Sequence, residues 1–287
     1  MKNALTDCRN NRIGEELTLR EIQQGELEIL RKVKEICTEL NISYFLFCGT
    51  LIGAVRHQGF IPWDDDVDVA MLRDEYERFI SYCRENEERL LPFKLYHYTT
   101  KKDYIYPIAR FVDTRYVVDY KDYKDYGLGL FVDLYPLDGC GNSLDERNKV
   151  FKAVRDDIIP LISLGARTNV PYNHGIINYV LKSLVRFTAQ LIGQNRLIRI
   201  IDQRARKHDV QSSQYVNCII WDTFKASMIR KECATDLMEA PFEDDSFLIP
   251  RGYDEMLRGE YGDYMQLPPE EDRVGHHYYK AYRKGKI

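Results

Sequence analysis

Residues 48–71 read CGTLIGAVRHQGFIPWDDDVDVAM, a stretch in which a glycine-containing turn precedes a dense group of acidic residues. Its four carboxylates fall within five positions: Asp64, Asp65, Asp66 and Asp68. If residues 66–69 form a strand, Asp66 and Asp68 share one face of that strand and the two valines share the other. The valines can then anchor the strand in a core. The stretch therefore predicts a buried strand that presents a pair of carboxylates to a cleft.

A group of unpaired carboxylates repels itself, and a bound divalent cation relieves this repulsion. Carboxylate oxygens suit Mg²⁺ or Mn²⁺, so Asp66 and Asp68 predict a site for one of these ions. A third carboxylate is expected from a neighbouring strand. Asp133 is the candidate, because it stands inside the apolar run GLFVDLYPLDG, where an unpaired charge is costly. Asp138, in the same run, has the sequence context of a turn or cap residue.

Gly49 and Thr50 lie between a short aromatic strand, expected at residues 44–48, and a helical turn. Glycine lets a phosphate approach the backbone, and the first turn of a helix offers free N–H groups to an anion. Arg56 follows on that turn as a candidate phosphate clamp. Arg110, in YPIARFV, is a candidate second clamp, with a surface ion pair as the alternative. A strand, a Gly-Thr turn and an Asp-x-Asp strand, in this order, indicate metal-dependent phosphate transfer.

The same acidic residues match part of an EF-hand calcium loop. Four residues fall at positions 1, 3, 5 and 12 of such a loop: Asp64, Asp66, Asp68 and Glu75. Position 6 is Val69, where the loop needs a glycine with a positive φ that a β-branched residue resists. Pro62 also interrupts any entering helix. The alternatives to the metal-dependent enzyme are thus a calcium-binding module, which this mismatch disfavours, and a solvated acidic turn.

The composition of the 287 residues is that of an ordinary globular protein, with 44% apolar and 30% charged residues. The formal net charge of -4 provides no basic field for a nucleic acid, so nucleic-acid binding is not expected. The seven cysteines are scattered without a CxxC pair, which is typical of reduced thiols. With no signal-like leader and no run of 18 apolar residues, the sequence predicts a cytoplasmic protein.

Hydrophobic spacing predicts an α+β fold, with a small mixed β-sheet flanked by helices and a mostly helical C-terminal half. Apolar residues at helical spacing predict an amphipathic helix over residues 17–40, and charged residues predict another over 73–89. Residues 93–135 are rich in strand formers. We expect a catalytic core over residues 1–140, and a helical region with a C-terminal segment over 141–287 that completes the site, together forming one compact unit.

A helix pair is expected at residues 176–206, and its charge is one-sided. Between His174 and His208 there are seven lysines or arginines and one acid, Asp202. A solvated basic face on a core helix pair explains this pattern. The alternative is peripheral contact with an anionic membrane through residues 176–208, at the inner membrane face.

Residues 49–71 strongly resemble the hallmark segment of the LicD-type phosphotransferases, which are kin to fukutin and fukutin-related protein. Three further stretches also resemble family segments: LREIQQGELEIL, GLFVDLYPLDG and IPRGYDEMLRGEYGDYMQLPPEEDRVGHH. The resemblance implies a nucleotidyltransferase-like fold. It also implies transfer of a phospho-alcohol, such as phosphocholine or ribitol phosphate, from a CDP-linked donor to a glycan hydroxyl.

The resemblance assigns roles to particular residues. Four aspartates match acidic positions of the family: the metal-binding pair Asp66 and Asp68, the third position Asp133, and Asp64 just ahead of the pair. In the implied mechanism, one or two Mg²⁺ ions bridge the donor diphosphate while CMP leaves. Asp133 would orient or deprotonate the acceptor hydroxyl. The Gly-Thr turn and the two arginines would hold the donor phosphates.

The ring face of Trp63, beside the acidic group, can attract a quaternary ammonium, which favours choline over ribitol or glycerol; core packing is the alternative. His276 and His277 either line the site or lie on the surface. Residues 145–217 match little of the family and are expected to set the acceptor. That acceptor would be a cell-surface glycan, such as lipopolysaccharide or teichoic acid, or its lipid-linked precursor. A true nucleotidyltransferase, which leaves a nucleotide on its acceptor, is the second enzyme hypothesis.

Overall fold

The computed structural model describes residues 13–120, 127–165, 176–220, 229–275 and 279–285. Within these residues a mixed sheet of seven strands is flanked by helices, so the predicted α+β class is confirmed. Five strands lie in the order β2 (Phe45–Leu46), β3 (Asp68–Leu72), β7 (Leu130–Gly139), β5 (Ala109–Asp113) and β4 (Phe93–Tyr96). The sheet is extended from the end of β7 by β8 (Tyr215–Asn217) and β9 (Ile229–Arg230). Strands β3 and β7 are parallel, and the other neighbours are antiparallel.

Helix α2 (Leu19–Glu39) packs against one face of the sheet and begins with a capping box. Its apolar stripe, predicted from helical spacing, is buried in one core with alternate residues of the central strands, among them Val69 and Leu134. Because side chains alternate along a strand, the preceding residues Asp68 and Asp133 point to the opposite face. The helix thus fixes the strands from behind and leaves their acidic side chains on the other side.

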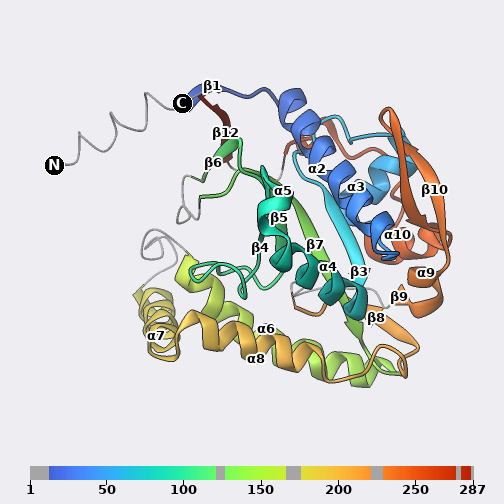
Figure 1. Ribbon diagram of the computed structural model, residues 1–287. Helices are drawn as coiled ribbons and strands as arrows, with labels where there is room; N and C mark the ends of the chain where they lie inside the picture. Colours follow the sequence, from blue (N-terminus) through green and yellow to red (C-terminus); the bar gives the residue numbers. More distant parts are fainter. Residues whose placement is uncertain (1–12, 121–126, 166–175, 221–228, 276–278, 286–287) are drawn as a thin grey trace.

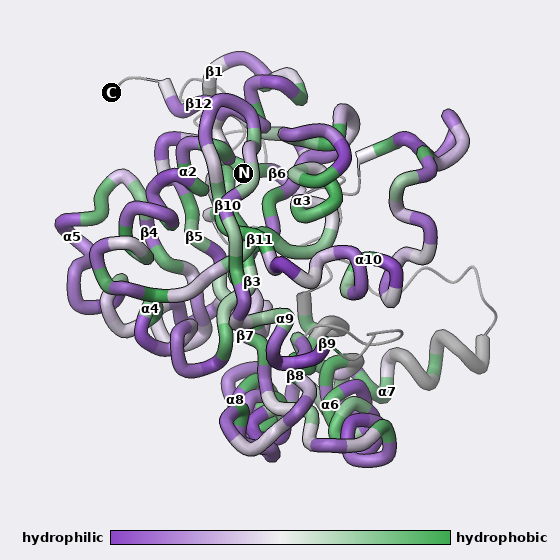
Figure 2. The backbone as a smooth tube through the Cα atoms, turned by 90° about the vertical axis from the view of Figure 1, so that its right-hand side faces the viewer, coloured by the Kyte–Doolittle hydropathy of each residue, from purple (hydrophilic) through white to green (hydrophobic). Residues whose placement is uncertain are grey.

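Helices α4 (Arg73–Glu85) and α5 (Glu87–Leu90) lie beside α2 (Figure 1). The single charged helix predicted over residues 73–89 is broken between them. The hydroxyl of Tyr76 accepts a hydrogen bond from the backbone N–H of Ala109 at 2.9 Å, which joins α4 to β5. Figure 2 shows hydrophobic residues running through the central strands, whereas α4 and α5 carry mostly hydrophilic ones.

Helices α6 (Leu144–Gly165), α7 (Ile176–Ile192) and α8 (Gln194–Ala205) form a layer beyond the end of β7 (Figure 1). Helices α6 and α8 enclose a second core, which also includes Leu137 of β7. The helical character predicted for this segment is confirmed. Among the described residues, no helix has both the length and the apolar character needed to cross a membrane.

A buried ion pair ties this helical layer to the sheet. Arg73 donates to the two carboxylate oxygens of Asp138 at 2.7 and 2.6 Å, and to Asp202 of α8 at 3.1 Å. Asp138 is 1% exposed and lies within β7. The prediction of a turn or cap residue at Asp138 is therefore wrong. The strand continues past it, because an arginine from a distant element compensates the buried charge.

The C-terminal half contains strands that its prediction as mostly helical did not include. Besides β8 and β9, they are the hairpin of β10 (Leu237–Phe242) and β11 (Asp245–Pro250), and β12 (Tyr279–Lys284). Strand β12 lies between β1 (Ile13–Glu16) and β6 (Tyr116–Tyr120). Two short helices accompany them, α9 (Lys231–Thr235) and α10 (Tyr253–Tyr261). The sequence signals were weak, because β10 contains a proline and β12 is rich in basic residues. The predicted two-part division of the chain stays a prediction.

Candidate functional site

Three charged residues lie in one row across the sheet. Asp68 of β3 is paired with Asp133 of β7, and Asp133 is paired in turn with Arg110 of β5. Residues opposite each other on neighbouring strands project from the same face. All three are buried, with exposed fractions of 3–5%. The fold therefore brings Asp68 next to Asp133, which is 65 positions further along the chain. Both are carboxylates predicted to bind metal.

The Arg110 guanidinium is bound to the Asp133 carboxylate. Its Nε donates to Oδ1 at 2.6 Å and its Nη2 donates to Oδ2 at 3.3 Å. The rings of Tyr106 and Phe131 each lie 4.1 Å from the guanidinium. The surface ion pair considered for Arg110 is thus wrong, since the pair is buried. Its role as a phosphate clamp stays a prediction.

The carboxylate of Asp68 is buried among other acids. Its Oδ1 has no hydrogen-bond partner among the described residues. Burial raises the pKa of this carboxyl well above its usual range, and three neighbouring carboxylates raise it further. These are Asp66, Asp133 and Asp64. A hydrogen bond from the Tyr135 hydroxyl opposes the rise in this pKa. The carboxylates that the sequence singled out therefore interact electrostatically in the folded protein.

The loop ahead of β3 gathers three acids. One carboxylate oxygen from each of Asp64, Asp65 and Asp66 lies within 4.8 Å of the other two, an arrangement that could hold a metal ion. Two buried or half-buried side chains hold the backbone of this loop. Gln23 of α2 donates to the carbonyl of Asp64 at 2.9 Å, and the Tyr279 hydroxyl donates to the carbonyl of Asp65 at 2.9 Å. Two elements distant in sequence thus position the acidic loop.

The Gly-Thr turn lies directly against the acidic residues. A Cβ on Gly49 would be 3.0 Å from Oδ2 of Asp64, so the missing side chain is what allows this approach. Thr50 is buried, and its Oγ1 accepts a hydrogen bond from the backbone N–H of Asp68 at 2.9 Å. The turn therefore helps to place the start of β3. That Gly49 and Thr50 hold donor phosphates stays a prediction.

After this turn the motif folds back on itself. Helix α3 (Cys48–Ile52) continues into a π-helical turn, η1 (Gly53–His57). A Cβ on Gly53 would lie 2.5 Å from the carbonyl oxygen of Gly59, so two backbone segments touch at a position that only glycine fits. Single π-helical turns are rare in proteins, and those that occur are frequently found at functional sites.

The C-terminal segment packs on the residues of the motif. Arg56 donates to the backbone carbonyls of Tyr264 and Gln266. The guanidinium of Arg273 lies over the ring of Trp63, 5.6 Å from its centre. Arg56 therefore holds the C-terminal segment against the motif. That Arg56 and Trp63 bind substrate stays a prediction.

His276 and His277 lie outside the described residues. Gly275, the residue before them, packs against the carboxylate of Asp65, with a notional Cβ 3.1 Å from its Cγ. The chain thus reaches the acidic loop immediately ahead of the two histidines, and their proposed place at the site stays a prediction.

Glu26 is a site residue that the sequence interpretation missed. It lies on the buried face of α2 with an exposed fraction of 0%, and its Oε2 has no hydrogen-bond partner among the described residues. The Tyr279 hydroxyl is 3.5 Å from its other oxygen. Burial, and then the charges of residues 64–66, raise the pKa of Glu26 well above its usual range. One feature of the sequence could have indicated it: Glu26 and Gln23 are polar residues on the otherwise apolar stripe of an amphipathic helix.

The EF-hand alternative does not fit the structure. Asp68 begins strand β3, whereas Glu75 lies on α4, where it pairs with Arg78 at 2.6 Å. A calcium loop would need both residues to face one ion across a single turn. A strand followed by a helix separates them instead.

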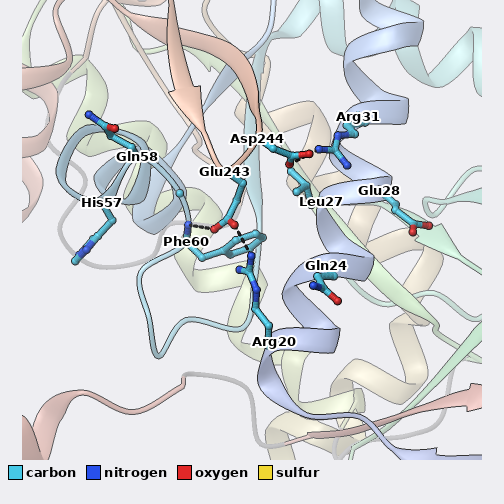
Figure 3. Close-up of a pocket in the computed structure, with 11 residues that line it drawn as sticks. Arg20, Gln24, Leu27, Glu28, Arg31, His57, Gln58, Phe60, Glu243 and Asp244 are labelled. Carbon is cyan, nitrogen blue, oxygen red and sulfur yellow. Dashed lines mark hydrogen bonds and ion pairs between the residues drawn. The ribbon is translucent and has the colours of Figure 1, made fainter.

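A polar pocket lies elsewhere in the described part of the chain. It has a volume of about 670 Å³ and is lined by residues of α2, by residues 57–60 of the motif, and by residues 243–244 in the β10–β11 turn (Figure 3). Glu243 accepts hydrogen bonds there from Arg20 at 2.5 Å and from the backbone N–H of Phe60 at 3.2 Å. None of the described acidic residues of the site lines this pocket. This polar pocket is therefore held together by the hydrogen bonds of Glu243 and is separate from the row formed by Asp68, Asp133 and Arg110.

The mixed sheet, the Gly-Thr turn and the acidic row agree with the nucleotidyltransferase-like fold that the resemblance implies. Residues 41–162 match the family model described as LicD/FKTN/FKRP, nucleotidyltransferase domain. Over 273 residues the chain is 34% identical to the lipopolysaccharide cholinephosphotransferase LicD of Haemophilus influenzae, covering 93% of this chain and 98% of that protein. An uncharacterized protein of Rickettsia typhi is 34% identical over 112 residues, which are 39% of this chain and 33% of that protein. The chain belongs to the LicD family.

Proposed function

We propose that this protein transfers a phospho-alcohol, phosphocholine in the first place, from a CDP-linked donor to a hydroxyl of a cell-surface glycan or its lipid-linked precursor. The similarity to the Haemophilus cholinephosphotransferase, which extends over nearly the whole chain, supports the reaction class. The observation that carries the chemistry is the buried Asp68, whose Oδ1 has no hydrogen-bond partner among the described residues. Three further carboxylates act on its charge. Such a site suits an ion and a diphosphate rather than a structural role.

The acidic residues fit a divalent cation, Mg²⁺ or Mn²⁺. All the candidate donors are carboxylate oxygens, and those of Asp64, Asp65 and Asp66 lie within 4.8 Å of one another. Asp64, Asp66, Asp68 and Asp133 would hold the ion. When bound, the ion would neutralise charge on the donor diphosphate.

The chain's own residues divide the remaining work. Asp133 is held in one orientation by Arg110, which suits a group that accepts the proton of the acceptor hydroxyl. Nη1 of Arg110 is buried and has no hydrogen-bond partner within the described residues. It would donate to a phosphate oxygen, so that Arg110 serves as the second clamp. The absent side chain at Gly49 leaves room for the donor phosphates beside Asp64.

Choline is favoured by the ring of Trp63. That ring already holds one cation, the guanidinium of Arg273, so its face is electrostatically suited to a quaternary ammonium. Choline would take the place of the guanidinium or share the ring with it. The six described cysteines are free thiols, which supports a reducing compartment, the cytoplasm, as the place of reaction.

The test is product analysis. The protein is incubated with Mg²⁺, a lipopolysaccharide that lacks phosphocholine, and CDP-choline, CDP-ribitol, CDP-glycerol or CTP. We expect CMP release and a phosphocholine-modified glycan with CDP-choline, and loss of both in Asp66→Asn. The matched control is Asp74→Asn, which changes an exposed aspartate on α4 and should leave turnover intact. Release of pyrophosphate from CTP, with a nucleotide left on the acceptor, would establish a true nucleotidyltransferase instead.

A further inference from the structure

Helix α7 carries an apolar stripe on its outer side. Four large side chains recur at helical spacing and are 57–72% exposed: Val180, Leu184, Phe187 and Leu191. Single exposed apolar residues are common on protein surfaces, but an aligned row along one helix face forms a contiguous patch. We name these four residues the α7 stripe.

The other side of α7 faces the protein. The helix packs on α6 and α8, and Ala189, on the side opposite the stripe, is fully buried in the second core. Figure 1 places α7 at the outer end of the helical layer. Within the part of the chain that the structure describes, nothing covers the stripe.

The exposed charges that follow the stripe in the chain are basic. The turn at Gly193 leads directly into α8, where Arg196 and Arg199 are exposed and form no ion pair among the described residues. The one acid of the segment, Asp202, is engaged with Arg73 and Arg206. The segment therefore carries an exposed apolar row that is followed, at the start of α8, by two exposed arginines without an ion pair among the described residues.

We propose that the α7 stripe docks on the surface of an anionic phospholipid bilayer, with α7 lying in the interface and Arg196 and Arg199 facing the headgroups. An amphipathic helix with basic residues beside its apolar face binds such a surface through both apolar burial and charge attraction. A second copy of the chain fits less well, because a two-fold contact through the stripe would bring like charges together. The proposal goes beyond the transfer reaction and concerns where the protein is held.

The test is co-sedimentation of the full chain with vesicles. We expect binding to vesicles of phosphatidylcholine with 30% phosphatidylglycerol, at least about tenfold weaker binding to phosphatidylcholine alone, and weakening by added salt. The double variant Leu184→Glu/Phe187→Glu should lose at least about tenfold in binding to the anionic vesicles. The control is Leu144→Glu, which changes a leucine that is 62% exposed on α6 and should bind like the parent.

A second measurement does not depend on the folding of the double variant. In Phe187→Trp, the new indole should be quenched by brominated phosphatidylglycerol if α7 enters the interface. Unchanged vesicle binding in a folded double variant, or no quenching at residue 187, would overturn the proposal. A lipid-free dimer that the double variant abolishes, without vesicle binding, would assign the stripe to a second copy instead. Because the readout is lipid binding, failure here leaves the proposed transfer reaction untouched.

Discussion

Arg110 and Asp133 are joined across β5 and β7 by two N–H···O contacts, of 2.6 and 3.3 Å, with both side chains buried. This pairing compensates one of the acids in the row. Asp68, in contrast, keeps a raised pKa, and its Oδ1 has no hydrogen-bond partner among the described residues. The charge that a divalent cation would balance is therefore concentrated at the β3 end of the row.

Removal of Arg110 should destabilise the fold strongly. Arg110→Ala leaves the Asp133 carboxylate buried without its counter-charge, which typically costs about 3–5 kcal/mol in the free energy of unfolding. Urea denaturation at neutral pH in EDTA measures this loss. Arg258→Ala is the control, because it removes an exposed pair with Asp254, and an exposed pair contributes little to stability. Equal losses in the two variants would contradict the structural role of the buried pair.

Glu26 should make the metal-free protein less stable as the pH rises. Its pKa is raised in the folded state, mainly by burial, so the folded chain holds a proton at pH values where the unfolded chain has released it. Its contribution to the free energy of unfolding therefore falls as the pH rises from about 4.5 through the raised pKa. Glu26→Gln removes this penalty.

We expect Glu26→Gln to match the parent near pH 4 in EDTA and to melt at least about 2 °C higher at pH 7.5. Added Mg²⁺ should narrow the difference, because the ion stabilises the ionised acids of the parent. Glu28→Gln changes an exposed residue on the same helix and serves as the control. A loss of stability in Glu26→Gln that is equal at all pH values would show that the side chain acts only through packing.

Replacing Gly53 by alanine should lower stability, whereas replacing Gly49 by alanine should raise the Mg²⁺ requirement. In Gly53→Ala the new Cβ meets the backbone of Gly59 at 2.5 Å, so we expect a loss of about 1–3 kcal/mol in urea denaturation. In Gly49→Ala it meets the Asp64 carboxylate at 3.0 Å, which can shift. That variant should keep its stability but need roughly tenfold more Mg²⁺ for turnover. Equal Mg²⁺ requirements in parent and Gly49→Ala would argue against Asp64 as a ligand.

Trp63 should distinguish donors by their charge. Trp63→Leu removes a ring face worth about 0.5–2 kcal/mol to a quaternary ammonium, so the KM for CDP-choline should rise roughly 2- to 30-fold. The KM for CDP-glycerol, which has no such cation, should stay the same. Steady-state assays with both donors measure the difference. If both KM values rise together, Trp63 contributes packing with Arg273 and no recognition of choline.

Much of the acidic centre could be predicted from the sequence because its signals are local. The alternation of Asp66 and Asp68 with Val67 and Val69 predicts a strand, and both valines are fully buried. Strand β3 begins only at Asp68, however, so the prediction that Asp66 shares a strand face with Asp68 is wrong, and Asp66 lies in the loop ahead of the strand. Asp133 stood out because an aspartate within an apolar strand needs a partner. The pairing of β3 with β7 then places Asp133 beside Asp68.

The partners of these residues could not be predicted, because they come from elements distant in the chain. Asp138 is a strand residue only because Arg73 reaches it from α4. Arg110 finds Asp133 through a strand register that local patterns do not encode. Glu26 reaches the acidic loop from α2, and its polar character on an apolar face was the one local signal available.

The most direct test of the central claim, that the acidic row binds a cation together with a cytidine-linked donor, is thermal unfolding with ligands. The protein is melted with and without Mg²⁺ in the presence of CDP-choline, CDP-ribitol, CDP-glycerol, CMP, ATP and UDP-glucose, beside Asp66→Asn and Asp74→Asn. A ligand at 100 times its Kd stabilises the fold by about 2.7 kcal/mol. We predict a Mg²⁺-dependent rise in Tm with CDP-choline that Asp66→Asn loses and Asp74→Asn keeps. No shift with any cytidine ligand, or a shift that is indifferent to Mg²⁺ and to Asp66, would contradict the account.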